Sequence, residues 1–299
     1  MPNSSLSSRI GPYRLTHVLG QGNMGVVHAG EHVATGAAVA VKTVTRVDAS
    51  RLSQIRCEIR ALARLDHPGV VRILDHGVTD GLPWYAMEKL QGATVADVFD
   101  RYWSAHRREA ASGDASGSNA TTSTDYDATC LLDTDAGSQA PEGARGGAVG
   151  GVRQAAAGHL DEVLTLAHRI CEILAYVHGE GIVHRDLKPG NIFMRADGQP
   201  ALVDFGLVSE ARGATGREVI EAAQQVSGSP PYMAPEQIRC DVLDARCDLY
   251  ALGCMLYQLV TGTLPFSGSR EQVIRAHLER RPVRPSDLVV GVSPALDDL

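Results

Sequence analysis

The stretch HRDLKPGNIFMRADGQPALVDFG, residues 184–206, brings the carboxylates of Asp186 and Asp204, the ammonium of Lys188 and the carboxamide of Asn191 into a short span. Between Asn191 and Asp204, two apolar runs flank the tight-turn dipeptide Asp197-Gly198, a pattern that predicts a hairpin. We expect this hairpin to bring Asn191 and Asp204 close together, because a hairpin folds back on itself. An amide oxygen beside a carboxylate suits Mg²⁺, which takes few protein ligands and uses phosphate oxygens for the rest.

Asp186 and Lys188 lie two residues apart on the segment that enters this hairpin. The carboxylate can accept a proton from an attacking hydroxyl, and the ammonium can neutralise a phosphoryl oxygen. Lysine is otherwise rare, because only Lys42, Lys89 and Lys188 among the 28 basic residues are lysines. Lysine is a compact point charge and arginine a planar fork, so we interpret Lys42 and Lys188 as phosphate-contacting positions. Lys89 suggests no such role.

The composition is that of a globular protein long enough for two lobes, with 299 residues of which 44% are hydrophobic. The formal net charge of −7 gives no indication of a nucleic-acid partner. Six cysteines show no paired C-x-x-C spacing and follow no signal peptide, which favours reduced thiols in a cytoplasmic protein. No apolar run is long enough to cross a bilayer, and a membrane anchor beyond residue 299 stays open.

The N-terminal part begins with a polar segment, residues 1–10, that we expect to be a disordered lead-in. A G-x-G-x-x-G pattern then spans residues 20–25, and alone it also occurs in dinucleotide-binding folds and in ordinary hairpins. The residues that follow are strand-like up to Gly30, turn at 34–36 and form another strand that ends at Lys42. A dinucleotide-binding turn would open a helix instead. We therefore predict a glycine-rich hairpin whose backbone amides close over phosphates.

Apolar residues at steps of three and four predict an amphipathic helix over residues 50–65. Glu58 lies beside its apolar stripe, where it is either a solvated helix residue or the partner of Lys42. Two short apolar strands, 70–77 and 82–87, complete a predicted five-stranded sheet.

A short helix is predicted over residues 93–102, and residues 104–158 then lose the apolar pattern. Their small and polar composition cannot offset the entropy of ordering, so we expect a disordered insertion. Its role stays open between an inert expansion and docking or regulation. A strong helical stripe at 160–177 resumes the folded part, and an apolar helix that begins near Asp248 adds core.

Taken in order, these motifs resemble the eukaryotic-like (Hanks-type) protein serine/threonine kinases, most of all their bacterial members. The resemblance rests on the glycine-rich hairpin, the V-A-V-K strand ending at Lys42, the H-R-D-L-K-P-G-N loop, D-F-G, and G-S-P-P-Y-M-A-P-E at 228–236. It implies an α+β fold with two lobes. The small lobe, 11–88, would be a five-stranded antiparallel sheet with helix αC, and the larger lobe, 89–299, would be mainly helical.

The same resemblance makes the end of the chain unusual. The sequence stops where the family would begin a further helix, so we expect a truncated chain with a large lobe that is incomplete at its end. Glu236 would then lack its usual arginine partner, because that arginine comes from the absent region.

The resemblance implies an ATP- and Mg²⁺-dependent enzyme, with Mn²⁺ as an alternative metal, that phosphorylates Ser and Thr hydroxyls of proteins. It also implies autophosphorylation of the activation segment 204–236, within a dimer where it occurs in trans. The implied catalytic residues are Asp186, Lys188, Lys42 and Glu58, and the implied metal ligands are Asn191 and Asp204. The implied nucleotide-contacting residues are Leu19, Gly20, Gln21, Gly22, Asn23, Met24, Gly25, Val26, Val27, Ala40, Lys42, Met87, Glu88, Leu90 and Phe193. The implied regulatory and substrate-platform residues are Arg185, Thr215, Ser227, Ser229 and Glu236.

Two of these implied roles can be stated as contacts. Glu58 should pair with Lys42 and set the position of the lysine on the phosphates. Ser229, which stands where threonine is usual, should hydrogen-bond near Asp186 and Lys188 and favour Ser and Thr substrates over Tyr.

Other functional classes fit less well. A catalytically silent scaffold with a kinase fold would usually lack the equivalent of Lys42, Asp186 or Asp204, and all three are present. A small-molecule kinase of related fold is disfavoured by the A-P-E segment at 234–236, which shapes a platform for protein substrates. A dinucleotide-binding oxidoreductase is disfavoured by the strand that follows the glycines.

Overall fold

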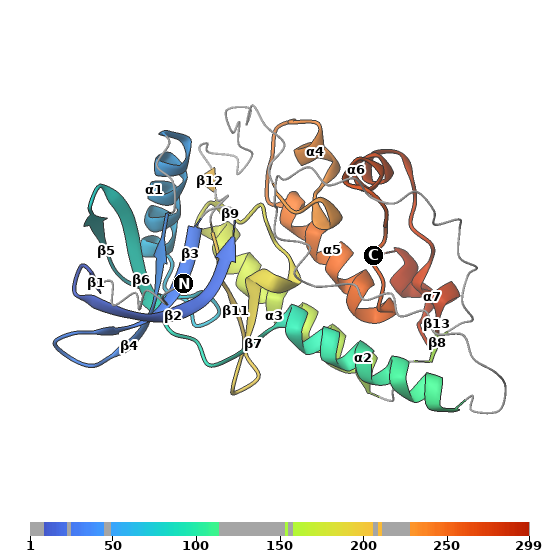
Figure 1. Ribbon diagram of the computed structural model, residues 1–299. Coiled ribbons are helices and arrows are strands. Elements are labelled where there is room, and N and C mark those ends of the chain that lie inside the picture. Colours follow the sequence, from blue (N-terminus) through green and yellow to red (C-terminus); the bar gives the residue numbers. More distant parts are fainter. Residues whose placement is uncertain are drawn as a thin grey trace, which may run out of the picture.

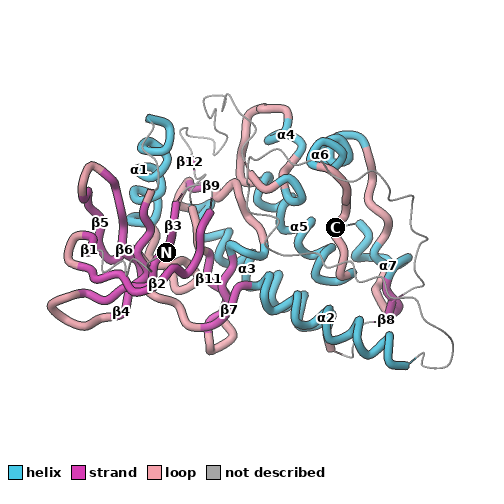
Figure 2. Tube along the Cα trace, viewed as in Figure 1, coloured by secondary structure: helices cyan, strands magenta, loops and turns pink. Residues whose placement is uncertain are grey.

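The computed structural model describes residues 9–22, 25–44, 49–113, 153–154, 158–205, 209–210 and 228–298. It has the two-lobed α+β architecture expected from the sequence (Figure 1). An antiparallel sheet with helix α1 (Ala49–Arg64) beside it is joined to a larger region built mainly from helices. Figure 2 shows the same division, with most strands in one lobe and most helices in the other.

The small lobe is a six-stranded antiparallel sheet in the order β1-β2-β3-β4-β6-β5. Its strands are β1 (Arg9–Ile10), β2 (Tyr13–Gly22), β3 (Gly25–His32), β4 (Ala38–Thr43), β5 (Ile73–Thr79) and β6 (Leu82–Glu88). The five predicted strands are present. The sixth, β1, corrects the prediction of a disordered lead-in over 1–10, because Gly11 at φ +54° turns Arg9 and Ile10 back onto β2. Residues 1–8 lie outside the described part.

The two faces of β4 have different surroundings, an apolar cluster on one side and helix α1 on the other. Val39 and Val41 are buried in an apolar cluster on one face of the sheet. Lys42 follows directly in the strand, so its side chain points to the opposite face, where α1 lies. In α1, Ile55 and Leu62 are buried in the main core, which continues into the large lobe.

The hairpin predicted after Asn191 is confirmed. β10 (Ile192–Arg195) pairs with β11 (Pro200–Leu202) in antiparallel fashion, and Gly198 adopts φ +77° in the turn between them. β10 also pairs with β7 (Gly92–Thr94), which follows the small lobe in sequence. The segment that links the two lobes is therefore attached to the same hairpin.

Helix α2 (Val95–Gly113) is longer than predicted, since it continues well past residue 102. The prediction that the disordered insertion begins at residue 104 is therefore wrong. Trp103 is buried, and Tyr102 stacks on His159 with ring centroids 4.0 Å apart. These aromatic contacts hold the helix against the large lobe where the sequence loses its apolar pattern.

The predicted insertion also contains one short strand near its end. β8 (Arg153–Gln154) pairs in parallel with β13 (Val289–Val290). The remainder of the insertion, residues 114–152 and 155–157, lies outside the described part.

The large lobe is built around helices α3 (His159–Gly179) and α5 (Arg246–Thr261). Their buried residues, including Ile170, Leu174 and Met255, belong to the main core. The other elements are β9 (Ile182–Val183), β12 (Ser209–Glu210), α4 (Pro235–Ile238), α6 (Arg270–Glu279), α7 (Pro285–Leu288) and the 3₁₀ helices Pro189–Asn191, Pro230–Tyr232 and Pro294–Asp298. Within the described ranges, we find no helix that combines the length and the apolar character needed to cross a membrane.

Candidate active site

A row of cross-strand neighbours runs across the small-lobe sheet, from Gly20 in β2 through Val27 in β3 and Lys42 in β4 to Tyr85 in β6. Directly opposite residues in an antiparallel pair share a face. The sheet therefore gathers Gly20, Val27 and Lys42, three of the predicted nucleotide-contacting residues, at one place. Ala40 pairs with Met87 two residues further along the same strands, on the same face.

Lys42 lies at the centre of a buried charge network. Its ammonium is 2.8 Å from Glu58 Oε1, 3.1 Å from Glu58 Oε2 and 2.6 Å from Asp204 Oδ1. Lys42 and Glu58 are only 5% and 1% exposed. Burying charges is unfavourable unless they are paired, so this arrangement depends on all partners being present. The network joins β4 and α1 of the small lobe to the D-F-G segment of the large lobe.

Tyr85 is a member of this network that the sequence analysis missed. Its hydroxyl donates to Glu58 Oε1 at 2.9 Å, and its ring centroid lies 5.8 Å from the Lys42 ammonium. Tyr85 is 1% exposed. In the sequence it reads as one more apolar strand residue, and only its position opposite Lys42 in the sheet could have indicated a polar role.

Burial and pairing compete in setting the pKa values of these groups. Burial opposes a charged Lys42, but the carboxylates of Asp204 and Glu58 outweigh it and hold the pKa of Lys42 well above its usual value. Burial would also raise the pKa of Asp204, yet the Lys42 ammonium keeps it lowered. For Glu58 burial prevails, and the pKa of Glu58 is raised despite Lys42. Lys42 is therefore a permanent cation beside an ionised Asp204.

Asp186 is held by three neighbours on the loop and the segment facing it. The backbone N–H of Ser229 donates to Oδ1 at 2.9 Å, and Lys188 Nζ lies 3.0 Å from Oδ2. The amide nitrogen of Asn191 donates to the Asp186 backbone carbonyl at 2.8 Å. Lys188 also donates to the Ser229 hydroxyl at 2.9 Å, so the contacts predicted for Ser229 with Asp186 and Lys188 are present.

A buried carboxylate fixes this loop from beneath. Asp248 in α5 is 0% exposed and accepts the backbone N–H groups of His184 and Arg185 at 2.9 Å and 2.8 Å. The carboxylate also lies 2.9 Å from His178 Nε2. Arg185 adopts φ +67°, a left-handed conformation that is unfavourable for a non-glycine residue and is maintained here by these bonds. His184 is fully buried, and its Nε2 lies 3.2 Å from Val203 O, so its side chain helps to hold the loop.

The two predicted metal ligands suit a hard cation. The Asp204 side chain is 44% exposed although Lys42 contacts one of its oxygens. Because the Asn191 amide nitrogen donates to Asp186, the amide oxygen is the atom available to a cation. A carboxylate and an amide oxygen match the preference of Mg²⁺ for few protein ligands supplemented by water and phosphate.

The link between the lobes carries the other predicted nucleotide contacts. Met87 and Glu88 end β6 and are half-buried, and the Glu88 backbone N–H donates to Arg72 O at 3.0 Å. Leu90 follows in the connection to β7, and Phe193 in β10 pairs with Thr94 in β7. These predicted nucleotide contacts thus lie at the end of β6, in the connection to β7 and in β10, which pairs with β7.

Some predicted residues cannot be placed. Asn23, Met24, Thr215 and Ser227 lie outside the described residues.

Two predicted regulatory residues are placed by the structure. The Nε of Arg185 is buried and has no hydrogen-bond partner among the described residues. Glu236 is half-buried in α4, and its loss of an arginine partner stays a prediction.

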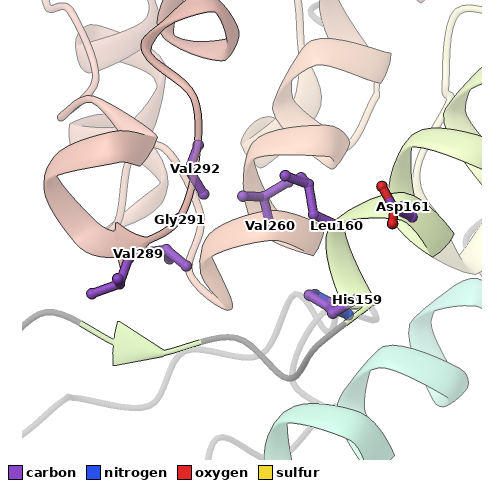
Figure 3. Close-up of a pocket in the computed structure, with 9 residues that line it drawn as sticks. His159, Leu160, Asp161, Val260, Val289, Gly291 and Val292 are labelled. Atoms are coloured by element: carbon purple, nitrogen blue, oxygen red, sulfur yellow. The ribbon is translucent and has the colours of Figure 1, made fainter.

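A cavity of about 180 Å³ lies in the large lobe, between the start of α3 and the segment 289–292 (Figure 3). Leu160, Val260 and Val289 supply much of its aliphatic lining, and His159 Nε2 lies 2.9 Å from Leu259 O. None of the predicted catalytic, metal or nucleotide residues lines this cavity, so it is distinct from the candidate active site. The candidate active site is the region around Lys42, Asp186 and Asp204, whose contacts are described above.

Known proteins share this arrangement of motifs. The family model described as "Protein kinase domain" matches residues 13–113 and 151–288. The chain is 33% identical over 298 residues to serine/threonine-protein kinase Pkn1 of Myxococcus xanthus, covering 97% of this chain and 34% of that protein. It is 30% identical over 294 residues to serine/threonine-protein kinase PknB of Mycobacterium leprae (strain TN), covering 95% and 38%.

A third relative is the DNA damage-responsive serine/threonine-protein kinase RqkA of Deinococcus radiodurans, 32% identical over 302 residues, which covers 100% of this chain and 36% of that protein. The chain thus spans between 34% and 38% of the length of these relatives. The family match includes both lobes and the segments that carry Lys42, Glu58, Asp186 and Asp204. The chain therefore belongs to the protein kinase family.

Proposed function

We propose that this chain is a protein serine/threonine kinase that transfers the γ-phosphoryl group of ATP to Ser or Thr hydroxyls of proteins, with Mg²⁺ as its metal. The observation that carries the proposal is that the buried Lys42 ammonium contacts both the buried Glu58 and the partly exposed Asp204. It brings a phosphate-binding cation of the small lobe to a metal-binding carboxylate of the large lobe. Well-packed apolar residues often replace a buried ion pair without loss of stability, so the fold alone does not require this network, which favours a catalytic role over a silent scaffold.

Each side chain has a separate task in this proposal. Lys42, held by Glu58 and Tyr85, would orient and neutralise the nucleotide phosphates. Asn191 and Asp204 would hold Mg²⁺, which when bound neutralises charge on the phosphate oxygens. Asp186 would orient the acceptor hydroxyl and take its proton, while Lys188 would neutralise the transferring phosphoryl group.

The preference for Ser and Thr is supported by the contact of Lys188 with the Ser229 hydroxyl. Ser229 also fixes Asp186 through its backbone N–H, so the segment that would bind the acceptor is coupled to the proposed base. The three relatives described above are all named serine/threonine-protein kinases, which agrees with this preference.

We further propose that the chain phosphorylates its own activation segment, 204–236, with Thr215 and Ser227 as acceptors. Where one molecule phosphorylates another, this reaction would take place in a dimer. Autophosphorylation is supported by the buried Nε of Arg185, which has no hydrogen-bond partner within the described part of the chain. A buried donor without an acceptor is unfavourable, and a phosphate on the activation segment could supply one.

The direct test measures ATP- and Mg²⁺-dependent phosphate incorporation into the purified chain and into myelin basic protein. Asp186→Asn should reduce incorporation by about 100-fold or more, because it removes the proposed base. Asp197→Asn, in the exposed turn of the hairpin, is the matched control and should be as active as the wild type. Mapping the phosphorylated residues tests Thr215 and Ser227. A wild-type chain that binds nucleotide but incorporates no phosphate would overturn the proposal.

A further inference from the structure

The guanidinium of Arg195 links three segments of the chain. Its Nη2 lies 3.1 Å from Glu88 Oε1 and its Nη1 3.3 Å from Glu88 Oε2, and Nη2 also donates to Pro68 O at 3.0 Å. Arg195 ends β10 in the large lobe, whereas Glu88 ends β6 in the small lobe. The two-pronged geometry is the strong form of an arginine–carboxylate contact, because both oxygens are engaged by a rigid planar group.

The carboxylate of Glu88 is fixed from the small-lobe side as well. Its Oε1 accepts the backbone N–H of Arg72 at 3.0 Å, and the Glu88 backbone N–H donates to Arg72 O at 3.0 Å. The Arg195 and Glu88 side chains are 24% and 26% exposed. Burial alone would raise the pKa of Glu88, but the hydrogen bonds from Arg195 and Arg72 keep it below its usual value. Glu88 is therefore an ionised, oriented group.

The chain that follows Glu88 is also held against β10. Ala196 N–H donates to Gln91 O at 3.0 Å, and Arg195 pairs with Gly92 in the β7–β10 ladder. Gly92 adopts φ +144°, and a side chain at this position would run into the Met194 carbonyl oxygen. The segment 88–92 is thus attached to the large lobe at its start by the Arg195 side chain and at its end by backbone pairing.

The contact with Pro68 adds a second connection of the same kind. Residues next to Pro68 are already bonded to β11, through Val71 N–H to Leu202 O at 3.0 Å and Leu202 N–H to Gly69 O at 2.8 Å. Arg195 therefore connects the β10–β11 hairpin both to the segment at Pro68 and to the end of β6 at Glu88. No predicted catalytic, metal or nucleotide role includes Arg195.

We propose that Arg195 is a positioning residue for nucleotide binding, which fixes the segment 87–90 against the large lobe before the nucleotide arrives. The proposal rests on the proposed function and on the nucleotide contacts of Glu88 and Leu90 that the resemblance to kinases implies. A segment that is already ordered does not have to be ordered by the ligand, so affinity is higher. Without Arg195 only a fraction of molecules has the binding-competent geometry, and the apparent dissociation constant rises in proportion. Lys42, Asp186 and Lys188 do not contact Arg195, so the phosphoryl-transfer step stays intact.

The test compares Arg195→Met with the wild type and with Arg14→Met. Methionine retains the apolar stem and removes the guanidinium. Arg14 pairs with Glu31 at 3.1 Å on the exposed outer part of the sheet, so it is a matched control for loss of an arginine ion pair. The probe is the fluorescent nucleotide mant-ADP, whose binding does not require catalysis. Circular dichroism verifies folding, and hydrogen exchange reports on the segment 88–92.

Arg195→Met should raise the Kd of mant-ADP and the KM for ATP by about 3- to 5-fold, with kcat at saturating ATP within about twofold of wild type. Exchange at 88–92 should become faster, and Glu88→Gln combined with Arg195→Met should add little to either single change. Arg14→Met should change none of these values. Unchanged Kd and KM in a folded Arg195→Met chain would overturn the inference while the proposed function stands. A wild-type chain that does not bind mant-ADP would overturn both.

Discussion

The two lobes meet through two ion pairs of different character. Lys42 lies 2.6 Å from Asp204, and the lysine and aspartate side chains are 6% and 44% exposed. The buried part of this contact is the pair that Lys42 forms with Glu58, which is 1% exposed. Arg195 lies 3.1 Å from Glu88, and both of these side chains are about one quarter exposed, at 24% and 26%. The first pair connects the sheet to the D-F-G segment, and the second connects the end of β6 to the hairpin.

Burial decides what each pair contributes. Removing one partner of a buried pair destabilises a protein by about 3–5 kcal/mol, because the other charge is left without compensation. A pair with access to solvent contributes about 1 kcal/mol or less and acts mainly by fixing geometry. We therefore expect changes at Lys42 to abolish turnover and changes at Arg195 to weaken nucleotide binding.

The largest effect is expected from Lys42→Met. This change removes the cation from the proposed phosphate site and leaves Glu58 buried with Tyr85 as its remaining donor. Turnover of ATP in the phosphate-incorporation assay should fall by about 100-fold or more, since a charge that contacts the transition state contributes several kcal/mol. Lys89→Met is the control, because Lys89 is exposed and contributes no such contact. Turnover within a few-fold of wild type in Lys42→Met would contradict the role given to this network.

An intermediate effect is expected from Tyr85→Phe. The change removes one oxygen and with it the hydrogen bond to Glu58, while both Lys42 contacts remain. We expect a loss of about 1.5 kcal/mol of stability, the lower end of the range for a hydrogen bond to a charged group. Turnover should fall by about 5- to 10-fold, which corresponds to a comparable free energy. Chemical denaturation and kcat measure the two effects.

Tyr13→Phe provides the comparison for Tyr85. Tyr13 is also buried in the small-lobe sheet, and its hydroxyl bonds to Asp75 at 3.4 Å, away from Lys42. It should lose stability without a matching loss of turnover. Equal loss of kcat in both variants would show that Tyr85 acts only through general stability.

The smallest effect concerns the pH dependence of the Glu88 pair. Burial raises and the Arg195 contact lowers the pKa of Glu88, and the net direction is downward. A carboxyl with a lowered folded-state pKa contributes stability above its unfolded-state pKa and loses it as pH falls through the folded-state pKa. The Tm of wild type minus that of Glu88→Gln should therefore be a few degrees at neutral pH and shrink between about pH 5 and pH 3. A difference that does not depend on pH would contradict an ionised Glu88.

Local pattern was sufficient for the elements that carry the site. The hairpin between Asn191 and Asp204 follows from two apolar runs around Asp197-Gly198, and it forms as predicted. The small-lobe strands follow from short apolar segments in the same way. The resemblance to kinases supplied the residue pair Lys42 and Glu58, whose contact local patterning left open.

The two elements that were missed have different causes, a distant packing contact and a local turn. Helix α2 continues beyond residue 102 because Tyr102 and Trp103 pack near His159, which is far away in the sequence. Arg9 and Ile10 form a strand only because Gly11 returns them to β2. Composition around these positions resembles that of a disordered segment, so no local signal opposed the wrong prediction.

The polar roles of Tyr85 and Arg195 were missed for a related reason. Tyr85 lies in a buried strand, where an aromatic residue needs no special explanation. Arg195 is one of many arginines in the chain, and its partner Glu88 is 107 positions away. The role of Tyr85 can be recognised only from the sheet register, which places it opposite Lys42. The role of Arg195 can be recognised only from the hairpin, which places it beside Glu88.

The central claim is that Lys42 acts mainly in turnover and Arg195 mainly in nucleotide binding. Its most direct test measures kcat and the Kd of mant-ADP in parallel for the wild type, Lys42→Met and Arg195→Met. Lys42→Met should lose turnover by a far larger factor than it loses nucleotide affinity. Arg195→Met should lose affinity and retain kcat at saturating ATP. The account would be contradicted if Lys42→Met kept its turnover, or if Arg195→Met lost kcat while its nucleotide affinity stayed unchanged.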